Sequence, residues 1–200
     1  AIMTPHAPRS RPAMDIRNAG CYSPFHPHVP RHNPLIPAEN SLRSSSVAGP
    51  SHAGRADIVV VGGGPGGSTI AALLAERGWR VVLLAKDRHP RFHIGESLLP
   101  LNLPLFERLG VKDQIERVSM AKFGVEFVSP YHGRTVTYDF ANAWDKSLPY
   151  SYQVRRSEFD HILLKNAVAK GAEVIEDCRV TEVEFRADAP VTVTALGAVG

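Results

Sequence analysis

The sequence predicts an α/β fold built on a parallel sheet, and three neighbouring features carry this prediction. A β-branched run at 57–61 is typical of a buried strand. After a glycine-rich bend, the apolar residues of 68–78 recur at helical spacing, and Gly78 is a plausible C-cap. A second β-branched run follows at 79–85. Strand, helix and strand thus fall within about 30 residues, which is the length of a βαβ unit with a right-handed crossover.

The segments downstream continue the alternation of helices and strands. Two short helices are expected at 98–110 and 111–118, after an irregular stretch. Apolar and polar residues then alternate on both sides of a turn at 129–134, which predicts an inserted β-hairpin. The clearest helix covers 157–171, where Ser157 and Asp160 match a capping box. Further strands are expected at 150–154, 172–177, 179–185 and 191–196.

Composition divides the chain near residue 57. Residues 1–56 hold nine prolines, five histidines and seven serines without apolar periodicity, which predicts a disordered leader. A transit peptide or an upstream read-through of the gene would have a similar composition. Residues 57–200 are expected to form one folded domain that is truncated at its C-terminal end.

Charge and cysteine usage argue against several classes of function. The net charge of +3 comes largely from arginines in the first 55 residues, so we expect no nucleic-acid-binding surface. Cys21 and Cys178 match no metal-binding spacing and are expected to be reduced thiols, which favours a cytoplasmic location. No apolar run reaches the roughly 18–20 residues of a membrane span, and no metal site is expected.

The bend after the first strand contains Gly62, Gly64 and Gly67 in the pattern G-x-G-x-x-G. Gly62 permits the tight turn off the strand, Gly64 lets a pyrophosphate approach the backbone, and Gly67 lets the helix pack against the strand. The free N–H groups and the dipole of the helix then face the phosphates. The sequence therefore predicts a Rossmann-type dinucleotide-binding unit, with a purely structural glycine turn as the alternative.

The acidic residue that usually binds the dinucleotide ribose is missing after the second strand. It should lie about 20 residues beyond the glycines, where the sequence has Ala85. Asp87 follows two residues later and could reach back, whereas Lys86 cannot accept a hydrogen bond from a hydroxyl. We therefore expect intact pyrophosphate binding and weakened ribose binding, unless Asp87, water or another group supplies the ribose contact.

Two further segments distinguish between the possible dinucleotides. They read PRFHIGESLLP at 90–100 and YQVRRSEFDHILLKNAVAKGAEV at 152–174. Together with the glycine bend, they resemble the FAD-dependent oxidoreductases of the aromatic-hydroxylase superfamily, and most closely the flavin-dependent, tryptophan-type halogenases and halogenase-like proteins. The resemblance covers 57–194 and has the character of an N-terminal fragment. It implies a Rossmann-type FAD-binding domain with an inserted β-hairpin and the start of a substrate domain.

The resemblance also implies which residues contact the cofactor FAD. The glycine loop would bind the pyrophosphate, the GES segment would form a strap along the flavin, Arg156 would contact FAD, and the strand around Val180 would flank the adenine. With Asp87 at the ribose, the expected cofactor-binding residues are Gly62, Gly64, Pro65, Gly66, Gly67, Ser68, Asp87, Gly95, Glu96, Ser97, Arg156 and Val180. Restoring the family's acid as Ala85→Glu should tighten FAD binding unless another group already serves there.

Catalysis in such an enzyme would use reduced flavin and dioxygen to halogenate or hydroxylate a small organic substrate. The context of Lys122 resembles that of the halogenase lysine that meets hypohalous acid, although a solvated lysine beside a strand is the simpler interpretation. Only one dinucleotide motif is visible, so a separate flavin reductase is an expected partner. A prenyl (geranylgeranyl-type) reductase-like flavoprotein and a truncated FAD-binding module without activity are the alternatives.

Overall fold

The fold is organised around a parallel sheet whose carboxyl edge carries the glycine bend. The computed structural model describes residues 14–19 and 54–197 of the 200-residue chain. In the sheet, β4 (Val81–Leu84) lies between β3 (Ile58–Val61) and β9 (Glu173–Ile175), with both pairings parallel. The helix α1 (Pro65–Glu76) connects β3 to β4, as the sequence predicts for a βαβ unit. The structure therefore confirms the α/β class and its Rossmann-type start.

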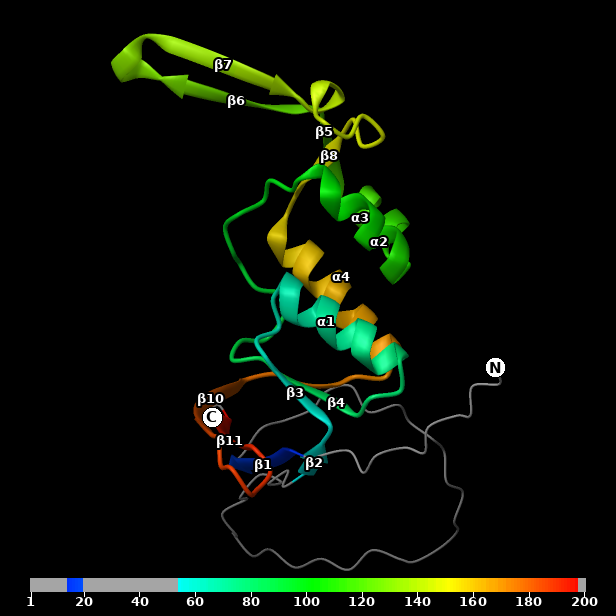
Figure 1. Cartoon of the computed structure of the whole chain (residues 1–200), viewed down its shortest axis with the longest axis vertical. Coiled ribbons are helices and arrows are strands. Elements are labelled where there is room, and N and C mark those ends of the chain that lie inside the picture. The colour runs from blue at the N-terminus through cyan, green and yellow to red at the C-terminus, as the bar shows by residue number, and fades with distance from the viewer. Residues whose placement is uncertain (1–13, 20–53, 198–200) are drawn as a thin grey trace, which may run out of the picture.

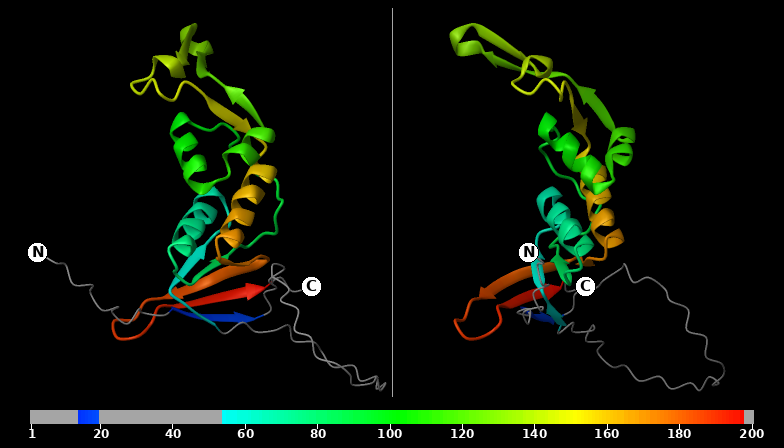
Figure 2. Two further views of the ribbon diagram at one scale, coloured as in Figure 1. Left: turned by 90° about the vertical axis from the view of Figure 1, so that its right-hand side faces the viewer. Right: turned by 45° about the vertical axis from the view of Figure 1, so that its right-hand side comes forward.

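Two helices cover one face of this sheet and bury most of the core. α1 lies beside α4 (Arg156–Ala169) in every view (Figures 1 and 2). The buried residues on α1 are small, which lets α4 approach closely: Ser68, Ala71, Ala72 and Ala75. Larger buried side chains such as Leu83, Phe159 and Leu164 fill the space between the helices and the sheet. The small residues of α1 thus set the position of α4, which carries the candidate site residue Arg156.

A second sheet lies at the opposite end from the hairpin and includes residues of the expected leader. Its strand order is β10 (Cys178–Glu184), β11 (Thr192–Gly197), β1 (Met14–Ala19), β2 (Gly54–Ala56). β1 pairs in parallel with β11 and antiparallel with β2. The expectation of disorder is therefore wrong for these two short segments, because main-chain pairing to an open strand edge requires no apolar periodicity. The other residues of 1–53 lie outside the described part of the chain.

The helices and hairpin upstream of α4 form the other end of the molecule. The 3-10 turn η1 (Pro100–Asn102) leads into α2 (Leu103–Leu109) and α3 (Lys112–Arg117), and β5 (Ser119–Lys122) pairs with β8 (Ser151–Val154). The expected hairpin consists of β6 (Gly124–Ser129) and β7 (Arg134–Asp139), joined through η2 (Pro130–His132) and followed by η3 (Phe140–Asn142). It extends away from the rest of the chain (Figure 1).

Three local expectations receive a clear answer from the described residues. The prediction of a capping box at Ser157 and Asp160 is wrong. α4 begins at Arg156, and its N-cap residue, Arg155, makes no side-chain capping bond. The Asp160 carboxylate instead accepts hydrogen bonds from Arg156. Cys178 takes part in a disulfide, so the prediction of a reduced thiol is wrong for this residue. Cys21 lies outside the described part of the chain. None of the helices within 14–19 and 54–197 has the length and apolar character needed to cross a bilayer.

Candidate cofactor-binding site

The glycine loop at the end of β3 has the geometry that its sequence pattern predicts. Gly62 has a φ of +106°, which side chains rarely adopt, and its N–H donates to the Leu84 carbonyl at 2.8 Å. A Cβ on Gly67 would lie 1.9 Å from the Gly62 carbonyl oxygen, so only glycine fits at this position. A Cβ on Gly64 would meet nothing closer than Arg91 Nη2, at 4.0 Å. Nothing within the described chain therefore requires glycine at 64, whereas a closely approaching pyrophosphate would.

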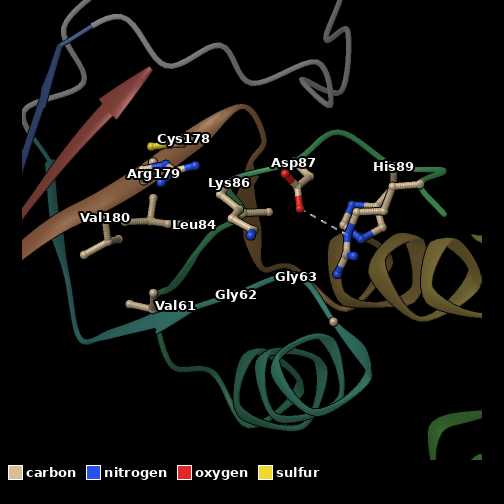
Figure 3. A pocket seen from close by; sticks show the side chains of 13 residues that line it. Val61, Gly62, Gly63, Leu84, Lys86, Asp87, His89, Cys178, Arg179 and Val180 are labelled. Atoms are coloured by element: carbon tan, nitrogen blue, oxygen red, sulfur yellow. Dashed lines mark ion pairs between the residues drawn. The ribbon is translucent and has the colours of Figure 1, made fainter. Parts of the chain in front are cut away.

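A cavity of about 210 Å³ opens beside this loop, at the carboxyl ends of β3 and β4. Ligands of open parallel sheets bind at this edge. Figure 3 shows the loop, the segment that follows β4, and the first residues of β10 surrounding the cavity. The expected ligands Gly62, Gly64, Asp87 and Val180 all line it. The structure thus brings together residues that span nearly 120 positions of the sequence, from Gly62 to Val180.

A second cavity, of about 260 Å³, begins on the other side of the same helix terminus. Gly64 lines the first cavity, whereas the next two residues, Pro65 and Gly66, line the second together with Gly95 and Arg156. The start of α1 therefore lies between the two cavities. An extended dinucleotide that passes over the N-terminus of α1 would reach both, with its phosphates at the helix dipole.

The GES strap borders this second region and is held by main-chain bonds to β8. Leu98 N–H donates to the Tyr152 carbonyl, and Val154 N–H donates to the Glu96 carbonyl, each at 2.9 Å. Gly95 has a φ of +92°, and the side chains of Glu96 and Ser97 are exposed. The strap is thus fixed to β8 through its backbone, which leaves the exposed Glu96 side chain available to a ligand.

Two of the expected ligands serve the protein itself in this structure. Ser68 is fully buried, and its hydroxyl donates to the Gly63 carbonyl at 3.2 Å. It therefore stabilises the conformation of the glycine loop. Arg156 donates through Nε and Nη2 to Asp160, and through Nη1 to the Ile94 carbonyl. Arg156 therefore ties the strap to α4, and its expected direct contact with the cofactor stays a prediction.

Arg91 is a cationic candidate that the sequence did not single out. Its guanidinium lines the first cavity near Gly64, and it faces Asp87 at 3.7 Å and the buried Asp160 at 4.0 Å. The dashed line in Figure 3 marks the pair with Asp87. A guanidinium held in this way matches the geometry of a phosphate. The signal in the sequence is the position of Arg91 in the segment PRFHIGES, four residues before Gly95.

His89, which lines the first cavity, forms a buried histidine–carboxylate pair with Glu176. The Glu176 Oε1 atom accepts from the backbone N–H of His89 at 2.6 Å and lies 2.8 Å from His89 Nδ1. Burial by itself raises the pKa of Glu176, but the hydrogen bonds from His89 outweigh it and hold this pKa below its usual value. Glu176 is therefore an ionised acceptor beside the cavity. Sequence reasoning could not pair these residues, which are 87 positions apart.

Replacing Ala85 with glutamate is expected not to tighten FAD binding, contrary to the first expectation from the sequence. Ala85 is 1% exposed, and a Cβ on Gly63 would lie 2.9 Å from its Cβ. Its N–H donates to the Ile175 carbonyl, and the register of β4 and β9 pairs Leu84 with Ile175, so a glutamate at 85 would lie beside Glu176, a second carboxylate. We expect Ala85→Glu to lower the melting temperature and to leave the dissociation constant for FAD unchanged or higher. Ala85→Ser, measured in parallel, controls for the added polar group, and tighter FAD binding by Ala85→Glu would contradict this expectation.

Lys122, the catalytic candidate, lies at the end of β5 against the strap. Its ammonium donates to the Ser97 hydroxyl and, at 3.2 Å, to the Leu98 carbonyl. It also lies 5.1 Å from the centre of the Phe140 ring. The structure thus connects the last residue of β5 directly to the segment that resembles the flavin strap.

Comparison with known proteins identifies the kind of domain and the extent of the match. A family model described as "FAD binding domain" matches residues 55–196. The tryptophan 2-halogenase of Chondromyces crocatus is 41% identical over 136 residues, which are 67% of this chain and 25% of that protein. A 1H-pyrrole-2-carbonyl-[peptidyl-carrier protein] chlorinase of Pseudomonas fluorescens is 33% identical over 156 residues, covering 70% of this chain and 35% of that protein.

Two solved structures that are similar to this chain are also flavin-dependent halogenases. The myxobacterial chondrochloren halogenase CndH is similar with a TM-score of 0.61 and 34% identity, over 70% of this chain and 35% of that one. The flavin-dependent halogenase CmlS gives a TM-score of 0.62 with 31% identity, over 69% of this chain and 25% of that one. The chain therefore spans about a quarter to a third of the length of these relatives.

Proposed function

Because the chain belongs to the FAD binding domain family and is related to flavin-dependent halogenases, we propose that it is the cofactor-binding part of an enzyme that halogenates a small organic substrate. The observation that carries this proposal is the contact between Lys122 and the strap at Ser97 and Leu98. A solvated surface lysine would have no need of this contact. A lysine placed to meet a reagent released near the flavin would be held in this way.

The residues of the site fit FAD in size and chemistry. The glycine loop leaves room for a pyrophosphate at Gly64, the helix N-terminus faces it, and Arg91 supplies a cation. The second cavity, beside Gly95 and Arg156, would receive the flavin half. Bound FAD, once reduced, supplies the reducing equivalents with which dioxygen and halide give hypohalous acid.

Lys122 would act on the hypohalous acid as a hydrogen-bond donor. Its ammonium would donate to the oxygen of the reagent and make the halogen more electrophilic. The halogen then forms a bond to an electron-rich carbon of the substrate, the proton of that carbon leaves, and the oxygen departs as water. Ser97 and the Leu98 carbonyl would keep the ammonium at the strap before the reagent arrives.

Flavin binding is the first test of this proposal. The 200-residue chain, mixed with FAD and separated from excess cofactor, should carry a flavin absorbance between roughly 350 and 500 nm. A protein that retains no flavin would overturn the proposal at the level of the cofactor.

Lys122→Ala is expected to lower halogenation by at least about a hundredfold, the effect usual for loss of a catalytic proton donor. The assay contains FAD, a flavin reductase, NADH, bromide and an electron-rich phenol or indole. FAD affinity should be unchanged. Lys146→Ala, at an exposed lysine in the loop before β8, is the matched control and should keep full activity. Equal activity of Lys122→Ala and the control would contradict the role of Lys122.

Product analysis in the same assay separates the other possible activities. A hydroxylated product would favour a monooxygenase, and reduction of a prenyl double bond would favour a prenyl reductase-like flavoprotein. Bound flavin without any product would favour an FAD-binding module without its own activity. A separate reductase as partner is supported if NADH alone sustains no turnover. The cytoplasmic location expected from the sequence also stays a prediction, which fractionation of tagged protein checks.

A further inference from the structure

One ring nitrogen of His89 contacts Glu176, and the other is buried beside the cofactor cavity without a hydrogen-bond partner among the described residues. Its side chain is 1% exposed and lines the first cavity. The Nδ1 atom lies 2.8 Å from Glu176 Oε1. The Nε2 atom is buried and makes no hydrogen bond within the described residues. A buried polar atom of this kind destabilises a protein unless a ligand or water satisfies it.

The contact with Glu176 determines the chemical character of the free nitrogen. Glu176 is ionised and can only accept, so the proton of a neutral His89 ring lies on Nδ1. The Nε2 atom then carries a lone pair and is a hydrogen-bond acceptor. Oε1 also accepts from the His89 backbone N–H, which fixes the carboxylate against His89, and its contact with Nδ1 orients the ring.

The ring lies beside the place where the ribose-binding acid is missing. A Cβ on Gly63 would lie 2.9 Å from the Ala85 Cβ and 3.0 Å from His89 Cε1, so both side chains border the same point of the loop. Glu176 follows β9, the strand that neighbours β4. The other acidic candidate, Asp87, faces Arg91 at 3.7 Å.

We propose that His89 Nε2 accepts a hydrogen bond from a hydroxyl of the adenosine ribose of FAD, in place of the carboxylate absent at Ala85. Glu176 is a positioning residue that fixes the tautomer and the orientation of the ring. This inference rests on the proposed FAD site. A pyrophosphate requires donors rather than a lone pair, and Arg91 and the start of α1 supply those donors. The ribose hydroxyl is the part of the cofactor whose chemistry matches an acceptor.

The test uses the full 200-residue chain and measures dissociation constants from the quenching of FAD fluorescence. His89→Asn keeps an amide donor near the position of Nδ1 and removes Nε2. It should weaken FAD binding about tenfold, the effect of one lost hydrogen bond, while leaving riboflavin binding unchanged. Competition with ADP and with its 2′-deoxy and 3′-deoxy forms then reports on the hydroxyls. The wild-type chain should prefer ADP to one of the deoxy forms, and His89→Asn should lose this preference.

Further variants separate a ribose contact from a structural role. Glu176→Gln should weaken the preference for ADP in part, because its amide still accepts from His89 but no longer fixes the tautomer. His132→Asn, at an exposed histidine in the hairpin turn, should bind all ligands like the wild type. A wild-type chain that binds FAD but does not distinguish ADP from either deoxy form would overturn this inference alone. Equal losses of ADP and both deoxy forms in His89→Asn would also overturn it. A wild-type chain without FAD binding would overturn the proposed function as well.

Discussion

Asp160→Ala is expected to lower the free energy of unfolding by about 3–5 kcal/mol, the usual effect of removing one partner from a buried ion pair. Asp160 is fully buried, and its carboxylate accepts from Arg156 Nε at 2.7 Å and from Arg156 Nη2 at 3.0 Å. Arg91 Nη2 approaches the same carboxylate at 4.0 Å. The variant would leave the guanidinium of Arg156, whose side chain is 11% exposed, without its carboxylate.

Chemical denaturation of the chain measures this effect, and two further variants locate its cause. Arg155→Ala removes a neighbouring arginine whose pair with Glu158 is largely exposed, and it should cost less than about 1 kcal/mol. Asp160→Asn keeps the volume but not the charge and should fall between the two. If Asp160→Ala and Arg155→Ala unfold at the same denaturant concentration, the buried pair does not stabilise the fold.

Gly67→Ala has the second large effect, and it should appear in both stability and cofactor binding. The added Cβ would lie 1.9 Å from the Gly62 carbonyl oxygen, so the loop or the helix must move by more than an ångström. Overpacking of this kind costs about 1–3 kcal/mol. Displacement of the loop N–H groups from the pyrophosphate should weaken FAD binding about ten- to a hundredfold, since hydrogen bonds to a charged group contribute about 1.5–3 kcal/mol each.

Thermal melting and FAD titration of Gly67→Ala give the two readouts. Gly54→Ala is the matched control, because a Cβ at Gly54 meets no atom within 4 Å, and it should change neither quantity. An unchanged FAD affinity in Gly67→Ala would show that the cofactor does not use this loop.

The parts of the site that the sequence predicts are those fixed by local steric rules. Gly62 and Gly67 are required by a positive φ and by a close backbone contact, and such requirements act over a few residues. The pair of His89 and Glu176 could not be predicted, because it depends on two strand ends that meet only in the folded sheet. The β1 strand was missed for a similar reason, since its pairing partner β11 lies near the other end of the chain.

The error at α4 has a different origin. A capping box is recognised from two residues of the same segment, and Ser157 and Asp160 satisfy that pattern. In the structure the Arg156 guanidinium binds the Asp160 carboxylate, which is then not available to a helix cap. The same guanidinium donates to the Ile94 carbonyl of the distant strap. A charged bidentate contact is stronger than a neutral cap, and its partner segment is not visible in a local pattern.

The hairpin of β6 and β7 has a consequence for how this domain opens. All residues of β7 are exposed, and the Phe127–Tyr138 pair at 5.9 Å is a contact within the hairpin itself. A two-stranded ribbon without a covering layer is only marginally stable. Its amide protons should therefore exchange with solvent through fraying of the arm alone, at a much lower free energy than opening of the β3–β4–β9 sheet. We therefore expect the domain to open as two cooperative units, with the glycine loop in the slowly exchanging one.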